Sequence, residues 1–140
     1  MKFITYEVAK KLKEKGFTCQ YPIAMYNELG SFHALYTSAD HNQNIKSVFG
    51  DREYYDYDDF DDKDCICPTI SQALDWLRTN HGIHVRADLW RKGWYFDVIS
   101  YEYDESLNEY KVINKYQSKD YKSYDDAMSV GIEYVIYNLI

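Results

Sequence analysis

The residues best equipped for chemistry are the carboxylates between positions 51 and 64. Eight acids stand there against two basic residues, Arg52 and Lys63, and they are Asp51, Glu53, Asp56, Asp58, Asp59, Asp61, Asp62 and Asp64. Carboxylate oxygens are the ligands that Ca²⁺ and Mg²⁺ prefer. A calcium-binding EF-hand loop also needs a central glycine and a closing glutamate, and residues 56–64 contain neither. The segment from Asp51 to Asp64 is therefore a solvated loop, a docking surface for a basic partner or a cation site, and we assign no metal ligand.

The three cysteines, Cys19, Cys65 and Cys67, form the second candidate group. An odd number at these spacings is not a disulfide framework, and reduced thiols are typical of a cytosolic protein. Cys65 and Cys67 could supply half of a zinc site, but such a site needs a second close pair of ligands. The histidines are not spaced as that pair; they are His33, His41, His81 and His84. Zinc is disfavoured, and the role of the thiols stays open.

The chain carries no sequence motif of an enzyme. A Gly-Xaa-Ser-Xaa-Gly elbow, a phosphate-binding glycine loop and a dinucleotide fingerprint are all absent. Cysteine, histidine and aspartate all occur, but nothing in their spacing places a nucleophile beside a base and an orienting acid. We therefore assign no catalytic residue and no cofactor, and we favour a protein without catalysis.

The second half of the sequence predicts the elements that would position any site. A helix begins after Pro68 and carries an apolar stripe to about Arg78. Alternating residues from Ile83 predict a strand, a turn at Arg91–Gly93 and a second strand. A turn near Asp104–Asn108 leads to a third strand, and Ser123 caps a last helix. The order predicts helix, three-stranded antiparallel meander, helix.

The first half predicts fewer elements. Thr5 to Gly16 is typical of a helix with an N-cap and a glycine stop. Phe17–Tyr26 and Ser31–Thr37 have the character of strands, and residues 51–64 show no clear periodicity. We expect one α+β domain over residues 1–140, with an N-terminal helix and one or two further strands added to the meander. A subdomain break is possible at the acidic segment 51–67.

Composition and charge limit the partners. Apolar residues make up 46% of the 140 residues, which is enough for a core, and the net charge is −7. This balance argues against direct nucleic-acid binding, which needs clustered basic residues. The helix–three strands–helix order is similar to that of double-stranded RNA-binding domains, but the start of the last helix has acids where those domains are basic. Without a signal-like or membrane-spanning apolar run, we expect a cytoplasmic protein and no membrane partner.

Aromatic residues crowd the predicted sheet. Tyrosine alone occurs 16 times, and it suits half-buried sheet faces and interaction surfaces. Among the aromatic residues of the first two meander strands are Trp90, Trp94, Tyr95, Tyr101 and Tyr103. They become core if the N-terminal half covers the sheet, and they contact a partner if it does not.

Three segments resemble known proteins: Ile4–Phe17, Pro68–Arg78, and Ser123–Ala127 with the terminal helix. They resemble small uncharacterised proteins carried by prophages and mobile elements of gut anaerobic bacteria. That group has no assigned activity, so the resemblance implies a phage or mobile-element context and no functional residue. The acidic segment and the cysteines have no counterpart in it.

Two functions follow as hypotheses. The first is a small non-catalytic accessory protein that binds another macromolecule, most simply a protein, and a sharper form makes Asp51–Asp64 imitate a phosphate track. The alternative is a metal-dependent hydrolase that uses the Asp-rich segment. A structural module that oligomerises through its aromatic sheet face is a third possibility. The partner, the oligomeric state and the role of Asp51–Asp64 are left open.

Overall fold

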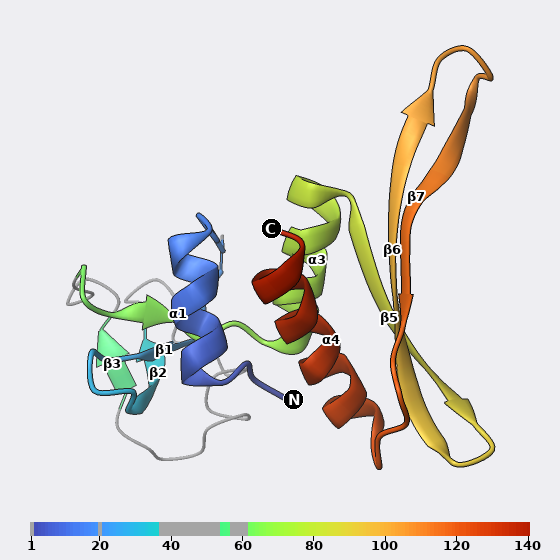
Figure 1. The fold of residues 1–140 in the computed structure, drawn as a ribbon. Coiled ribbons are helices and arrows are strands. Elements are labelled where there is room, and N and C mark those ends of the chain that lie inside the picture. The colour runs from blue at the N-terminus through green and yellow to red at the C-terminus, as the bar shows by residue number, and fades with distance from the viewer. Residues whose placement is uncertain (1, 20, 37–53, 57–61) are drawn as a thin grey trace. The chain divides into compact units, whose positions relative to one another are not determined.

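A computed structural model of the chain describes residues 2–19, 21–36, 54–56 and 62–140. Its contacts divide the chain into two compact units, Met1–Thr69 and Ile70–Ile140. Helices and mainly antiparallel strands make up both units (Figure 1), so the predicted α+β class is confirmed. The expectation of a single domain stays a prediction.

The N-terminal unit combines one described helix with a four-stranded sheet. The strand order is β3-β2-β1-β4, and β2 pairs with β3 in parallel whereas the other pairs are antiparallel. The elements are α1 (Tyr6–Glu14), β1 (Ala24–Tyr26), β2 (Phe32–Tyr36), β3 (Tyr54–Asp56) and β4 (Cys65–Ile66). The helix and the strand in Ser31–Thr37 are confirmed. The strands β3 and β4 lie in or beside the acidic segment, for which the sequence showed no strand periodicity.

The C-terminal unit has the predicted order of helix, meander and helix. Its elements are α3 (Ile70–His81), β5 (Ile83–Trp90), β6 (Gly93–Asp104), β7 (Glu109–Gln117) and α4 (Tyr124–Asn138). The strands form an antiparallel sheet in the order β5-β6-β7. The side chain of Ser123 accepts a hydrogen bond from the backbone N–H of Asp126, so the predicted cap of the last helix is confirmed.

The core of the C-terminal unit lies between α4 and one face of the sheet. Alternation places Val85, Phe96 and Val98 on this face, and all three are buried. Gly131 of α4 comes so close that an added Cβ would lie 2.6 Å from Val85 Cγ1. The ring of Tyr134 on α4 stacks on Tyr116 of β7 with centroids 4.1 Å apart. Helix α4 therefore covers the part of the sheet where all three strands are present.

Two core predictions need correction. Helical spacing predicts a buried stripe of Ile70, Ala73, Leu74 and Leu77, with Trp76 at its edge. In the structure Trp76 is 8% exposed and Leu74 is only half-buried. Alternation along β5 puts Leu89 on the same face as Ile83, Val85 and Ala87 and so predicts that it is buried. Its side chain is 57% exposed. It pairs with Trp94 close to the β5–β6 turn, so this end of the strand leaves the core.

Candidate interaction surface

The strands β6 and β7 continue past the end of the three-stranded sheet. Strand β5 pairs with β6 only over Gly93–Ser100, so Tyr101–Asp104 pair with β7 alone. We call residues 101–113 the arm, and it is visible in Figure 1 as a two-stranded ribbon. Every residue of the arm is exposed except Asp104, which is half-buried. A two-stranded hairpin in water is marginally stable without a surface to pack against, so the arm is an unusual structure for an isolated protein.

A β-bulge at the base of the arm determines which side chains lie on each of its two faces. Ser100 pairs with Asn114 and Tyr101 pairs with Val112, which leaves Ile113 without a partner. A shift of one residue in register moves every side chain of a strand to the other face. Without the shift, Tyr103 would lie opposite Lys111. With it, Tyr103 lies opposite Tyr110, and apolar and charged residues separate onto two faces.

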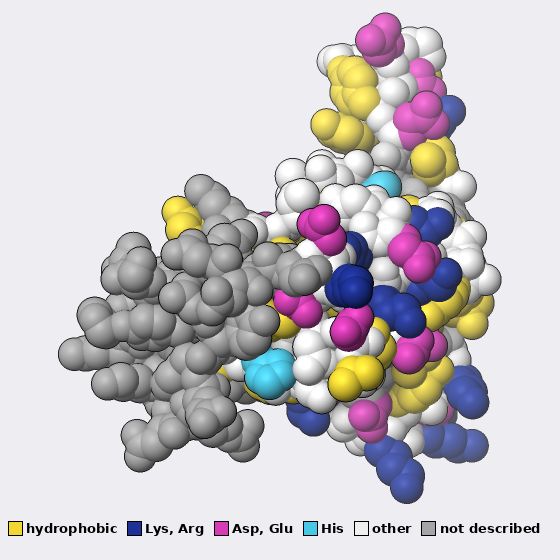
Figure 2. Space-filling model, turned by 90° about the vertical axis from the view of Figure 1, so that its left-hand side faces the viewer, with side chains coloured by type: hydrophobic (Ala, Val, Ile, Leu, Met, Phe, Trp, Pro, Cys, Tyr) yellow, Lys and Arg dark blue, Asp and Glu magenta, His cyan; other side chains and the backbone are white. Residues whose placement is uncertain are grey.

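The apolar side of the arm, here called the tyrosine face, consists of Tyr101, Tyr103, Tyr110 and Val112. Their side chains are 41%, 44%, 70% and 52% exposed. Tyr103 and Tyr110 meet edge to face with ring centroids 5.1 Å apart. On the face shown in Figure 2, apolar and acidic side chains both reach the surface of the arm, at the top of the picture. Contiguous exposed apolar groups of this kind mark contact sites on proteins.

The charged face carries the residues that alternate with the tyrosines. Glu102 pairs across the ribbon with Lys111, and Asp104 pairs with Glu109. Lys111 Nζ lies 3.8 Å from a carboxylate oxygen of Asp104. Two acids directly opposite one another repel, so the outer pair of this face is a site where added positive charge is favourable.

The turn that closes the arm is held by its own side chains. The carboxylate of Asp104 accepts hydrogen bonds from Ser106 Oγ at 2.6 Å and from the backbone N–H of Ser106 at 3.0 Å. These bonds, led by that of the Ser106 hydroxyl, lower the pKa of Asp104. Asn108 adopts a left-handed conformation with φ of 52°, and its side-chain oxygen accepts a hydrogen bond from the hydroxyl of Tyr103. The arm is thus a shaped element rather than a loose loop.

A small hollow lies at the base of the tyrosine face. It has a volume of about 200 Å³, and its lining includes Leu74, Arg78, His84, Ile99 and Tyr101. The rings of His84 and Tyr101 meet edge to face at 5.4 Å. The hollow is smaller than the ~300–1,000 Å³ of a typical small-molecule site, which favours a single anchoring side chain of a partner over a free substrate.

A second depression lies at the start of α4. It has a volume of about 470 Å³ and is lined by Lys92, Lys119 and Lys122, with Asp120 and Asp126 beside them. Phosphate recognition depends on positive charge that acids nearby do not cancel. The depression therefore combines three lysines with two aspartates, and the expectation about nucleic acid stays a prediction.

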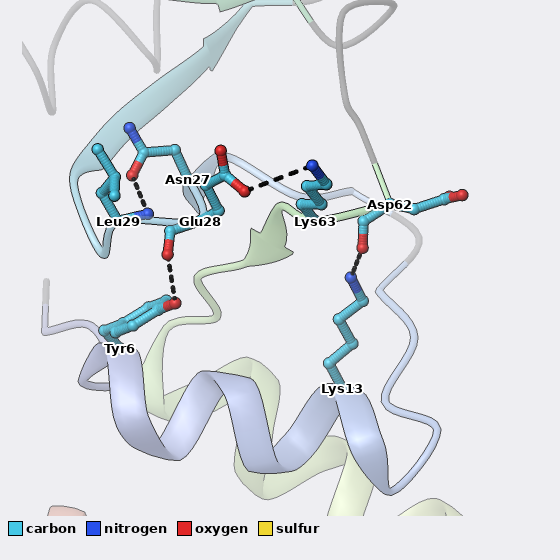
Figure 3. Close-up of polar contacts among 7 residues, drawn as sticks. All are labelled: Tyr6, Lys13, Asn27, Glu28, Leu29, Asp62 and Lys63. Atoms are coloured by element: carbon cyan, nitrogen blue, oxygen red, sulfur yellow. Dashed lines mark hydrogen bonds and ion pairs between the residues drawn. The ribbon is translucent and has the colours of Figure 1, made fainter.

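The acidic segment is described only in part, because residues 51–53 and 57–61 lie outside the described residues. Lys13 of α1 donates a hydrogen bond to the backbone carbonyl of Asp62, and Lys63 Nζ lies 3.8 Å from a carboxylate oxygen of Glu28 (Figure 3). Lys13 also donates to the backbone carbonyl of Asp64 at 2.7 Å. These contacts join the end of the segment to the fold of its own unit. In the described part of the chain, no three His, Cys, Asp or Glu residues lie together as a metal site requires.

Cys65 of β4 and Cys67, just after this strand, are packed side chains. Cys65 is 2% exposed and Cys67 is fully buried, and the Cys67 thiol donates to the carbonyl of Ile4 at 3.5 Å. Burial raises the pKa of Cys67 to about 12 and also raises that of Cys65. Since the thiolate is the reactive form, burial and the raised pKa both disfavour reaction at these two thiols in the folded protein.

Sequence reasoning found part of this surface. It singled out Tyr101 and Tyr103 among the sheet aromatics but missed Tyr110, Val112 and Ile113. The available signal was the symmetry of Tyr103 and Tyr110 about the turn at Asp104–Asn108. The bulge gives no such signal, because the third strand alternates irregularly around Ile113.

Comparison of the chain with protein-family models, with curated proteins and with solved structures finds no match. No helix in the described part of the chain is both long and apolar enough to cross a membrane.

Proposed function

We propose that this chain is a non-catalytic accessory protein that acts by binding another protein through the tyrosine face of its arm. The observation that carries the proposal is the bulge-sorted arm itself, which presents four apolar side chains on one side of an otherwise unsupported ribbon. Tyrosine is enriched among the residues that dominate binding energy at interfaces. The phage or mobile-element context implied by the resemblance agrees with an accessory role.

The test uses the full chain as bait in a lysate of the cell that produces it. The double variant Y103S/Y110S removes two rings from the tyrosine face, and Y137S removes a comparably exposed ring (49%) from α4. We expect wild type and Y137S to retain a discrete protein and Y103S/Y110S to bind it at least about 30-fold more weakly, as for the loss of a hot-spot residue. Circular dichroism confirms that the variants are folded.

Equal binding by all three proteins would contradict the proposal, as would the absence of any retained protein. The hydrolase alternative rests on Asp51–Asp64. A rise in melting temperature with Ca²⁺, Mg²⁺ or Zn²⁺ would favour that alternative, because a ligand of the native state stabilises it.

A further inference from the structure

The charged face of the arm gives information about the partner that the tyrosine face does not. The arm carries four acids and one base, which are Glu102, Asp104, Glu105, Glu109 and Lys111. Lys111 and the turn residues engage Asp104. Among the residues that the structure describes, Glu102, Glu105 and Glu109 form no salt bridge. Three exposed carboxylates therefore remain next to the apolar surface.

The geometry of the ribbon brings both faces within reach of one partner. Among the described strands, none besides β6 and β7 pairs along the arm, so side chains on either face border edges that these strands leave open. Charges interact over a Debye length of about 8 Å at physiological salt. A surface that covers the tyrosine face and follows the ribbon around its edge experiences the field of Glu102 and Glu109.

Charge also decides between classes of partner. A second copy would bring an arm of the same sign from a chain of net charge −7, and a nucleic acid would bring phosphates toward carboxylates. Electrostatic repulsion opposes both encounters, whereas a basic protein surface is complementary in charge to the carboxylates of the arm.

Building on the proposed function, we propose that the arm inserts into a cleft of a basic partner protein. One wall of this cleft is apolar and contacts Tyr103 and Tyr110. The other wall carries lysine or arginine side chains that face Glu102 and Glu109. The apolar wall supplies most of the affinity, and the basic wall sets orientation and association rate.

The first experiment locates the two walls by crosslinking the retained protein. A photoreactive benzoylphenylalanine at position 110 reports the surface against the tyrosine face. A carbodiimide joins carboxylates to amines in direct contact and reports lysines near Glu102 and Glu109. We expect carbodiimide links from these glutamates to partner lysines, and photoproducts at position 110 with apolar partner residues.

The second experiment measures binding of the purified partner at several salt concentrations. E102Q/E109Q keeps the shape of the charged face and removes its charge, and E133Q on the exposed face of α4 is the matched control. We expect E102Q/E109Q to weaken binding about tenfold, mainly through the association rate, and the difference to vanish near 0.5 M salt. E133Q should behave as wild type.

The outcomes separate the two proposals. If position 110 crosslinks a partner protein but E102Q/E109Q binds as tightly as wild type, the basic wall is wrong and the proposed function stands. If the retained species is a second copy or a nucleic acid, the inference about the partner is overturned. If no species depends on the tyrosine face, both proposals fail.

Discussion

The base and the arm of the β6–β7 hairpin belong to the same two strands and contain similar residues, yet their environments are opposite. At the base, Ile99 is 5% exposed, whereas Tyr103, on the same face of β6 in the arm, is 44% exposed. The difference arises because β5 is shorter than β6 and pairs with it only as far as Ser100 of β6. Apolar residues continue along this face of β6 from the base into the arm, but they are buried at the base and exposed in the arm. What covers a strand face is decided by other elements, and no element within residues 2–19, 21–36, 54–56 and 62–140 covers the tyrosine face of the arm.

The largest expected effect separates the energetic roles of base and arm. Phe96→Ala should lower the free energy of unfolding of the C-terminal unit by about 3–5 kcal/mol, because it opens a cavity beneath α4. Tyr103→Ala should change the same quantity by less than about 1 kcal/mol, since its exposed ring contacts Tyr110 and, among the described residues, its hydroxyl bonds only the exposed side chain of Asn108. Urea unfolding followed by fluorescence and circular dichroism measures both. A loss of several kcal/mol in Tyr103→Ala would show that the arm belongs to the folded core.

A smaller effect tests how tightly α4 packs on the base. Gly131→Ala places a methyl group 2.6 Å from Val85 Cγ1 and 3.1 Å from the Phe96 ring. Overpacking costs about 1–3 kcal/mol, which exceeds the helix-propensity gain of about 1 kcal/mol. We expect a lower melting temperature, and Ser129→Ala on the less buried side of α4 serves as the control. A higher melting temperature for Gly131→Ala would mean that the helix is not seated as described.

Within the arm, Asn108 tests whether the turn is shaped by its sequence. Its φ of 52° is a conformation that costs alanine about 1–2 kcal/mol, so Asn108→Ala should increase hydrogen exchange of arm amides about fivefold to thirtyfold. Amides of β5 and of the base should be unaffected, because the arm opens locally. Asn108→Gly relieves the backbone cost and should exchange more slowly than Asn108→Ala. Equal exchange in all three proteins would contradict a defined turn.

The smallest effect is a pH dependence of the same turn. The pKa of Asp104 is lowered in the folded arm, chiefly by the Ser106 hydroxyl. Such a group stabilises the folded turn above its unfolded pKa of about 3.9 and loses this contribution as pH falls through the lower folded value. Local opening of the arm, measured by the chemical shifts of Ser106 and Leu107, should therefore increase below about pH 4. Asp104→Asn should remove that transition, and its persistence would assign it to another group.

Much of the C-terminal unit could be predicted because its signals are local. Ser123 caps α4 through its own side chain, and the alternation of residues from Ile83 predicts the strands whose buried residues include Val85, Phe96 and Val98. The tyrosine face could not be predicted in full. It depends on the register between β6 and β7, which a one-residue bulge at Ile113 changes. It also depends on how far β5 pairs along β6. Both are set by contacts between strands and cannot be predicted from a local sequence pattern. In the N-terminal unit, the parallel pairing of β2 with β3 joins segments that are distant in the chain, and no local sequence pattern predicts this pairing.

The central claim is that the tyrosine face is open to solvent in the free protein and covered in the complex. Hydroxyl-radical footprinting of the purified protein, alone and with the retained partner, tests it most directly. We predict strong oxidation of Tyr103 and Tyr110 in the free protein, protection of both in the complex, and no oxidation of Phe96 in either. Tyrosines that resist oxidation in the free protein, or that are oxidised equally in the complex, would contradict the account.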